Sequence, residues 1–397
     1  MRILWVTPYL PVPNFGGGTR VFNLMKALAA RGDAIDLIAA IDPGQRVGDD
    51  LRAVCRTIET ETKPTADRWR KRLLQVRALV SRHPSQYWLT YLPGVRARIT
   101  RAIAERPFDI VMLAHSFNGY YPIPSGVPVV LDQHNVESEL LLRSGKRERS
   151  PVRRAYNLLE YARFRADERR ICRGADLLLA TSALDREVME AWGDLPPCVV
   201  IPNGVDTTYF APQPEVAEVP NRLVFTATMN YGPNAEAAIH FATHIWPQVR
   251  AAIPDATLKI VGHGPPAPVR QLGQRPGITV TGSVPDVRPY LASAQAVVVP
   301  LRIGGGTRLK IVEALAMAKP VVTTTLGAEG LAVEPGRHLL IADDPDAFAS
   351  DVIALLRDPA RRASLAHAGR ALVEERYDWG AIGAQLDDAL HHLLPER

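Results

Sequence analysis

Residues 304–313 read Gly-Gly-Gly-Thr-Arg-Leu-Lys-Ile-Val-Glu and join a strand-like segment to a helix-like one. The apolar run Ala296–Val299 precedes them, and a helical pattern of apolar residues follows. A strand, a glycine turn and a helix start favour anions, because the first helical N–H groups are unpaired and the helix dipole attracts negative charge. Arg308 and Lys310 add two positive charges, and Glu313 could accept hydrogen bonds from a diol. This order fits a phosphate-bearing ligand that ends in a diol, as a nucleoside-diphosphate sugar does.

The composition is that of an ordinary globular protein. The 397 residues exceed what one hydrophobic core usually organises, so two domains are expected. Hydrophobic and charged residues make up 47% and 22% of the chain, which is typical of globular domains. Three widely spaced cysteines exclude a disulfide scaffold and match no zinc-binding spacing. The first apolar run, Ile3–Val6, is too short for a signal peptide, so we expect a cytoplasmic protein.

Short apolar segments alternate with amphipathic helical segments along the chain. Apolar runs without alternation indicate strands buried on both faces, as in parallel sheets covered by helices. The first series of predicted strands comprises Ile3–Val6, Ile35–Ala39, Ile110–Leu113, Val129–Leu131, Leu177–Ala180 and Val199–Ile201. The second series comprises Leu223–Ala227, Leu258–Val261, Ile278–Thr281, Ala296–Val299, Val321–Thr324 and Leu339–Ala342.

The two series predict two Rossmann-like, doubly wound α/β domains that face a central cleft. The segment 211–221 lies between the series, holds three prolines and shows no periodicity, so we predict a linker there. The first domain then spans residues 1–210, and the second spans residues 222–375. A closing helical segment, 376–397, is predicted to pack back on the first domain. Ligands of this architecture bind beyond the carboxyl ends of the strands.

Glycine and polar residues follow the predicted strands of the first domain. Gly17 and Gly18 belong to a glycine run that lacks the dinucleotide-binding spacing, and we expect this run to form one wall of the cleft. His115 follows the third strand closely and is predicted to point into the cleft. The fourth strand is followed by Asp132, His134, Asn135 and Glu137. These last residues could orient acceptor hydroxyls or cap the next helix, and their spacing with His115 matches no familiar metal site.

Glycine-bearing loops also follow three successive strands of the second domain. Gly262 and Gly264 come after the second strand, Val284 comes two residues after the glycine that follows the third, and the stretch 304–313 follows the fourth. A flat base and a ribose could pack on such a surface and pair with its backbone. We therefore predict that these loops bind a nucleotide.

Basic residues are concentrated in two blocks of the first domain, residues 63–106 and 143–173. One interpretation is that they are solvated helix faces. The alternative is a surface for anionic lipid or for a phosphate-bearing acceptor, at the inner face of the membrane. No motif supports nucleic-acid binding.

The order of these motifs resembles glycosyltransferase family 4, whose members are retaining enzymes of the GT-B fold. The resemblance covers most of the chain. In the second domain it is strongest at Val224–Phe241, Ile260–Pro265, Thr281–Leu291 and Val299–Leu331. In the first domain it includes Gly16–Gly18, Asn135–Ser138 and Ile201–Asp206.

The resemblance implies a donor that is bound mainly by the second domain. Glu313 matches the family's ribose-binding glutamate, Val284 lies near the base, and His115 matches a histidine near the reacting sugar. We assign catalytic roles to His115, Arg308 and Lys310. The implied donor-binding residues are Gly17, Gly18, Gly262, Gly264, Val284, Gly305, Gly306, Thr307 and Glu313. The candidate acceptor-binding residues are His134, Asn135 and Glu137.

The sequence departs from the family pattern in two places. Gly305 occupies the position where the family usually has a glutamate that contacts the donor sugar. The family's Arg and Lys pair after the first strand of the second domain is also missing, and Asn230, Tyr231 and Asn234 occupy that region. Arg308 and Lys310 could supply the missing charge from another loop. The identity of the sugar is therefore not predicted.

The expected activity is retaining transfer of a sugar from a UDP- or GDP-linked donor to an acceptor hydroxyl, without a metal ion or other cofactor. The acceptor would be a glycan, a lipid-linked molecule or a small molecule in polysaccharide, glycolipid or other glycoconjugate synthesis. One alternative is a nucleotide-sugar 2-epimerase of similar fold. Another is a non-catalytic nucleotide-sugar-binding protein, which the glycine at position 305 would suit.

Overall fold

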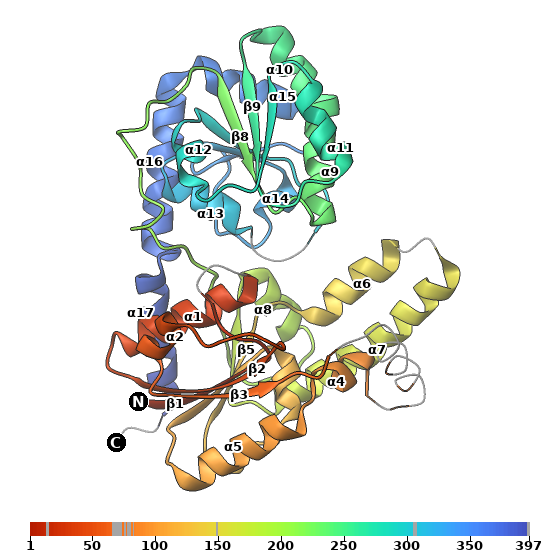
Figure 1. Cartoon of the computed structure of the whole chain (residues 1–397), viewed down its shortest axis with the longest axis vertical. Helices are drawn as coiled ribbons and strands as arrows, with labels where there is room; N and C mark the ends of the chain where they lie inside the picture. The colour runs from red at the N-terminus through yellow and green to blue at the C-terminus, as the bar shows by residue number, and fades with distance from the viewer. Residues whose placement is uncertain are drawn as a thin grey trace. The chain divides into compact units, whose positions relative to one another are not determined.

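The computed structural model describes residues 1–12, 16–65, 74, 77, 81, 83–147, 150–304 and 308–394. The chain forms two compact units, Met1–Pro202 together with Ile382–Arg397, and Asn203–Ala381 (Figure 1). The division differs from the predicted one, because the residues after Pro202 pack on the second unit. Glu218 of the expected linker pairs with Lys319 at 2.6 Å. The last helix, α17 (Trp379–Leu393), belongs to the first unit from Ile382 onward.

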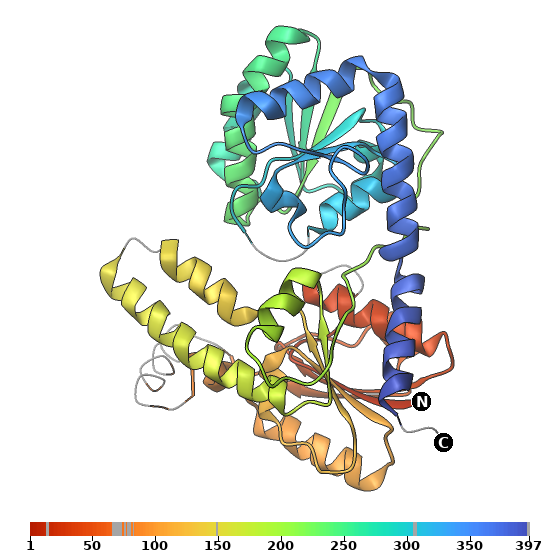
Figure 2. The same cartoon turned by 180° about the vertical axis from the view of Figure 1, so that it is seen from behind.

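The described part of the first unit contains a seven-stranded parallel sheet in the order β3-β2-β1-β4-β5-β6-β7. Its strands are β1 (Arg2–Thr7), β2 (Ala34–Ile41), β3 (Thr57–Thr62), β4 (Ile110–Ala114), β5 (Val129–Gln133), β6 (Leu177–Ala180) and β7 (Cys198–Val200). Its helices are α1 (Gly16–Ala29), α2 (Asp49–Val54), α4 (Ser85–Thr90), α5 (Pro93–Glu105), the 3-10 helix η1 (Ser116–Tyr120), α6 (Glu137–Arg147), α7 (Pro151–Arg173) and α8 (Ala183–Glu190). Helices α6 and α7 pack against each other as an antiparallel pair (Figure 2).

The described part of the second unit contains a six-stranded parallel sheet in the order β10-β9-β8-β11-β12-β13. Its strands are β8 (Arg222–Thr226), β9 (Thr257–Val261), β10 (Ile278–Gly282), β11 (Ala296–Val299), β12 (Val321–Thr323) and β13 (Leu340–Ile341). Its helices include α9 (Gly232–His240), a π-helical segment η2 (Phe241–Ile245), α10 (Trp246–Ala252), α11 (Ala267–Gln271), η3 (Leu272–Gln274) and α12 (Arg288–Ala292). They continue with α13 (Leu309–Ala316), α14 (Thr325–Ala328), α15 (Pro345–Arg357) and α16 (Pro359–Arg376).

The prediction of two parallel-sheet α/β units is confirmed, and every predicted strand overlaps an observed one. Strand β3 was not predicted, because its residues read Thr-Ile-Glu-Thr-Glu-Thr and lack an apolar run. This strand lies at the edge of the sheet and pairs with β2 alone among the described strands. Edge strands are buried less completely, so their sequences carry less of the apolar signal.

The glutamates of β3 also change the interpretation of the first basic block. Arg98 and Arg101 of α5 form ion pairs at 2.5 Å with Glu61 and Glu59 of β3, respectively. These two arginines are therefore engaged within the unit, which weakens their assignment to a lipid-binding surface. Residues 66–73 of the same block lie outside the described residues.

Candidate functional site

In the first unit, the ends of three neighbouring strands bring two histidines and a tyrosine together. Tyr9 lies two residues after β1, His115 directly follows β4, and His134 directly follows β5. The Tyr9 hydroxyl lies 3.0 Å from Nε2 of His115 and 3.2 Å from Nδ1 of His134. Parallel strands place these residues at one edge of the sheet although they are far apart in sequence.

A buried ion pair holds His134 in this arrangement. Nε2 of His134 lies 2.9 Å from Oδ2 of Asp132, and Arg20 of α1 donates to Asp132 at 2.7 Å. Arg20 also donates to the carbonyls of Ile201 and Pro202, at 2.8 and 2.9 Å. Burial alone would raise the pKa of Asp132, but the charges of Arg20 and His134 hold it well below its usual range. The carboxylate therefore stays ionised and fixes the ring of His134.

His115 is held in an unusual backbone conformation. Its φ of 64° and ψ of 149° lie in a region that residues other than glycine rarely adopt, at a cost of about 1–3 kcal/mol. Its N–H donates to the Asp132 carbonyl at 2.9 Å, and the next N–H donates to the Gln133 side chain at 3.0 Å. This conformation aims the His115 ring at Tyr9 and Glu137, which makes the residue a candidate for function.

The His115 side chain is neutral near pH 7. Burial and the neighbouring His134 lower the pKa of His115 well below 6.5. Its Nδ1 atom lies 3.8 Å from Oε1 of Glu137 and has no hydrogen-bond partner among the described residues. Burial also raises the pKa of Glu137. A neutral imidazole beside this carboxyl can exchange hydrogen bonds with a sugar hydroxyl.

The glycine run at the start of α1 touches the same network. A Cβ atom on Gly17 would lie 2.6 Å from the Tyr9 hydroxyl and 3.1 Å from Nδ1 of His134. A Cβ on Gly18 would lie 3.2 Å from the backbone nitrogen of Val12. Both glycines therefore have a packing reason to lack side chains. Their predicted contact with the donor stays a prediction.

The predicted acceptor-binding residues fall into two groups. Both ring nitrogens of His134 are engaged by Tyr9 and Asp132, and the side chain is buried, so an acceptor hydroxyl has no ring nitrogen to bind. Asn135 and Glu137 are half-buried and lie close together, with 3.5 Å between Asn135 Nδ2 and Glu137 Oε1. Of the three, Asn135 and Glu137 remain available for an acceptor.

The structure also decides what caps the helix that follows β5. Glu168 of α7 accepts hydrogen bonds from the N–H groups of Glu137 and Ser138, at 3.0 and 3.1 Å. Burial raises the pKa of Glu168 to about 7. This role of Glu168 was not predicted from the sequence, because its partners lie about 30 residues away. Among the described residues no cluster of three His, Cys, Asp or Glu side chains could hold a metal ion.

In the second unit, Lys310 is fixed near the start of α13. Its Nζ donates to Oδ1 of Asn234 in α9 at 2.7 Å and lies 5.3 Å from the centre of the Phe225 ring. Asn234 is itself oriented, because its Nδ2 donates to the Thr228 carbonyl at 2.8 Å. Asn234 lies in the region where the family pattern expects a basic residue. The structure thus brings the charge of Lys310 to that region.

The charged side chains around the start of α13 are largely buried. Arg308 is the N-cap residue of α13 and is 7% exposed. Burial and the charge of Arg308 lower the pKa of Lys310 to about 8, and burial raises the pKa of Glu313 to about 7. An anion bound beside Lys310 and Arg308 would offset their mutual repulsion. The predicted donor-binding residues Gly305, Gly306 and Thr307 lie outside the described residues.

The other predicted nucleotide-binding loops have a structural reason for their glycines. Gly262 has φ of 147°, and a Cβ there would lie 1.8 Å from the Ala227 carbonyl oxygen. Gly264 has φ of 66°, which also favours glycine. Val284 is partly buried and packs on the core of this unit. The predicted contacts of these residues with the donor stay predictions.

Tyr9 and Arg20 were not identified as site residues from the sequence, and the role of Asn234 as the partner of Lys310 was not predicted. Tyr9 carries a usable signal, because it follows the end of a buried strand as His115 does. Arg20 and its partner Asp132 are 112 residues apart, and no spacing rule connects them. Asn234 was noted only as a departure from the family pattern.

Both halves of the chain match glycosyltransferase family models. Residues 16–209 match the model described as Glycosyltransferase Family 4, and residues 220–358 match the model described as Glycosyl transferases group 1. The chain belongs to glycosyltransferase family 4. The glycosyltransferase is thus an enzyme, and the matches give no support to the epimerase or to a non-catalytic binding protein.

Among its relatives is a phosphatidyl-myo-inositol mannosyltransferase of Mycobacterium leprae. The two are 26% identical over 398 residues, which cover 97% of this chain and 95% of the relative. A GDP-mannose-dependent monoacylated alpha-(1-6)-phosphatidylinositol monomannoside mannosyltransferase of Corynebacterium glutamicum is 32% identical over 224 residues. That match covers 52% of this chain and 59% of the relative.

Solved structures confirm the GT-B fold of the glycosyltransferase. Sucrose-phosphate synthase from Thermosynechococcus elongatus matches with a TM-score of 0.71 and 19% identity over 99% of each chain. HepE of Anabaena in complex with UDP-glucose matches with a TM-score of 0.65 and 16% identity, over 99% of this chain and 100% of that one. None of the described helices is both long enough and apolar enough to cross a membrane.

Proposed function

We propose that this glycosyltransferase moves a sugar from a UDP- or GDP-linked donor to an acceptor hydroxyl, with retention at the anomeric carbon. The observation that carries this proposal is the arrangement around α13. Lys310 is held by Asn234 at 2.7 Å, Arg308 precedes it at the N-cap, and Glu313 follows it by about one turn. Two positive charges at a helix start suit a diphosphate, and Glu313 suits the ribose diol.

The electrostatics of α13 support a role in catalysis as well as in binding. When the sugar leaves the donor, negative charge builds on the diphosphate. Positive groups that are already desolvated and oriented stabilise such charge strongly, because they need no reorganisation during the reaction. Lys310 and Arg308 meet this description. We therefore propose that they neutralise the leaving diphosphate without a metal ion or another cofactor.

His115 is the residue of the first unit that we propose to contact the transferred sugar. It is neutral at pH 7 and is held by Tyr9, so it can hydrogen-bond a sugar hydroxyl without adding charge. Retention then follows a front-face path in which the leaving phosphate takes the proton of the acceptor hydroxyl. No carboxylate nucleophile is required on this path.

The acceptor is proposed to be a glycolipid or lipid-linked glycan at the cytoplasmic face of a membrane. The names of the relatives above include phosphatidylinositol acceptors. Helix α7 carries the exposed residues Val152, Arg153 and Arg154 near its start, and this mixture suits an anionic lipid surface. Sedimentation with phosphatidylglycerol vesicles at low salt tests the surface. Absence of binding there would count against the membrane location.

The Lys310→Ala variant tests the proposed function. We expect turnover to fall about 100-fold, as for the loss of one donor to a developing anion, and the melting temperature to change little. Mass spectrometry follows the consumption of UDP- and GDP-sugars by the full chain. Detergent-solubilised phosphatidylinositol and methyl glycosides serve as acceptors. Lys259→Ala is the matched control, because Lys259 lies on β9 and bonds only Thr279 among the described residues. A folded Lys310→Ala enzyme with unchanged turnover would refute the assignment.

A further inference from the structure

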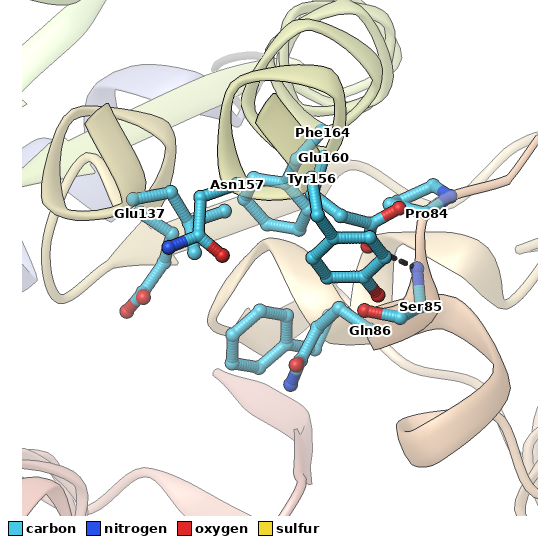
Figure 3. A pocket seen from close by; sticks show the side chains of 10 residues that line it. Pro84, Ser85, Gln86, Glu137, Tyr156, Asn157, Glu160 and Phe164 are labelled. Carbon is cyan, nitrogen blue, oxygen red and sulfur yellow. Dashed lines mark hydrogen bonds between the residues drawn. The ribbon is translucent and has the colours of Figure 1, made fainter. Parts of the chain in front are cut away.

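A pocket in the first unit lies between the start of α4, η1, α6 and α7. Its volume is about 130 Å³, and Figure 3 shows side chains of α4, α6 and α7 around it. The residues that line it include Phe117, Glu137, Tyr156, Asn157, Glu160 and Phe164. All of them belong to one compact unit, so the pocket does not depend on the second unit.

Glu160 is the polar group that indicates a ligand. Its side chain is 5% exposed, and its Oε2 accepts a hydrogen bond from the N–H of Ser85 at 2.7 Å. Its Oε1 is buried and has no hydrogen-bond partner among the described residues. An unpaired buried carboxylate oxygen is costly, and a hydroxyl donor in the pocket would relieve that cost.

The rest of the wall combines aromatic rings with a polar side chain. Phe117 and Phe164 lie with their ring centres 6.0 Å apart, and Tyr156 adds a third ring. The Asn157 amide also lines the pocket. The negative face of an aromatic ring attracts the C–H face of a sugar ring, while carboxylate and amide groups bind hydroxyls. This mixture suits a ring that is apolar on its faces and polyhydroxylated at its edge.

The charges of the pocket exclude an anionic ligand. Two carboxyl groups, Glu137 and Glu160, line it, and none of the described lining residues is Lys, Arg or His. A phosphate would meet repulsion without any compensating cation. The group that enters the pocket is therefore not an anion, even where the complete acceptor carries a phosphate elsewhere.

The pocket adjoins the residue that we propose to contact the transferred sugar. Phe117 stacks on His115 with 5.5 Å between ring centres and 8° between planes. Glu137 Oε1 lies 3.8 Å from Nδ1 of His115. A ring in the pocket would therefore place hydroxyls near His115 and Glu137.

We infer that this pocket binds an uncharged, hexose-sized polyol ring, a pyranose or a cyclitol, as the acceptor part of the substrate. The inference rests on the proposed function, since it gives the chemistry of the acceptor for that reaction. It assigns Glu160 as an acceptor-binding residue and Phe117 as the surface on which the ring stacks. Glu137, shared by the pocket and the His115 site, would bind the hydroxyl nearest to the reaction.

The test measures binding of methyl α-D-mannopyranoside, methyl β-D-glucopyranoside and myo-inositol to the full chain by saturation-transfer NMR. Glucosamine and inorganic phosphate serve as charged probes. In Glu160→Gln, the amide oxygen can keep the Ser85 bond but the NH2 group then faces the pocket, so polyol affinity should fall about tenfold. Asn157→Phe should fill the pocket and abolish polyol binding. Glu187→Gln on the exposed face of α8 is the matched control and should bind polyols as the wild type does.

Each outcome bears on the inference. Polyol binding that survives both Glu160→Gln and Asn157→Phe in folded proteins overturns it, and so does binding of glucosamine or phosphate in place of neutral polyols. UDP and GDP binding is measured on the same samples and should be unaffected by the pocket variants. Nucleotide binding without polyol binding contradicts the pocket alone. Polyol binding without nucleotide binding contradicts the proposed donor site alone.

Discussion

At the scale of single residues, the orientation of His115 depends on Tyr9. The Tyr9 hydroxyl lies between Nε2 of His115 and Nδ1 of His134, and the second histidine is anchored by Asp132. An ionised carboxylate thus fixes His115 through two intermediate side chains. Hydrogen-bonded chains of this kind set both the tautomer and the direction of a histidine ring.

Tyr9→Phe should therefore lower turnover about tenfold while it changes the free energy of unfolding by about 1 kcal/mol. The ring stays in place, but the link between the two histidines is lost. Turnover, thermal melting and the ¹⁵N shifts of the His115 ring measure the effect. Tyr161→Phe is the control, because the Tyr161 hydroxyl accepts from Arg165 at an exposed position. Unchanged His115 shifts together with unchanged turnover in Tyr9→Phe would show that Tyr9 does not position this ring.

Protonation of Glu313 makes the free energy of unfolding depend on pH. Burial raises the pKa of Glu313 from 4.5 to about 7, so the folded protein holds this proton more tightly than the unfolded chain does. The free energy of unfolding then falls as the pH rises from about 4.5 to about 7. Glu313→Gln removes this loss, so the variant should be more stable than the wild type at pH 8, by about 3 kcal/mol, and should match it at pH 4.

Urea unfolding of the wild type and of Glu313→Gln at both pH values measures this difference. The same variant should bind nucleotide more weakly, because an amide replaces the carboxylate that is proposed to accept the ribose hydroxyls. A stability difference that is equal at pH 4 and pH 8 would mean that folding does not raise the pKa of Glu313.

At the scale of elements, buried strands could be predicted because burial leaves a continuous apolar run, as in Ala296–Val299. The edge strand β3 could not be predicted, because its alternating glutamates face the arginines of α5 instead of a core. The positions of His115 and of the α13 region could also be predicted, because both follow the ends of predicted strands. The partners that orient these residues were not predictable, because Tyr9 and His134 are 125 residues apart and meet only in the folded sheet.

The contact between the ends of β8 and β9 makes a prediction about Gly262. A Cβ at this position would lie 1.8 Å from the Ala227 carbonyl oxygen, and φ of 147° disfavours any side chain. Gly262→Ala should therefore destabilise the second unit by more than about 2 kcal/mol. Gly273→Ala is the control, since its Cβ would meet nothing closer than 3.9 Å. An unchanged free energy of unfolding in Gly262→Ala would contradict the steric role. The glycine would then be explained by ligand binding instead.

At the scale of the whole molecule, the two units use the same part of their architecture. In the first unit, Tyr9, His115 and His134 follow the carboxyl ends of β1, β4 and β5. In the second unit, the corresponding loops after β8 and β11 lead to Asn234 and Arg308. The candidate residues of each sheet thus gather at one edge, as expected for doubly wound folds. Each unit carries its own chemistry, with Arg308, Lys310 and Glu313 at α13 and a tyrosine, two histidines and a buried ion pair around His115.

The most direct test of the donor site is a thermal-shift comparison of nucleotides on the wild type and on Lys310→Ala. A ligand that binds only the folded protein raises its melting temperature by mass action. We predict that UDP or GDP raises the melting temperature of the wild type by several degrees, that the matching monophosphate raises it less, and that Lys310→Ala abolishes the advantage of the diphosphate. Equal shifts with monophosphate and diphosphate, or an undiminished diphosphate shift in Lys310→Ala, would contradict a diphosphate site at α13.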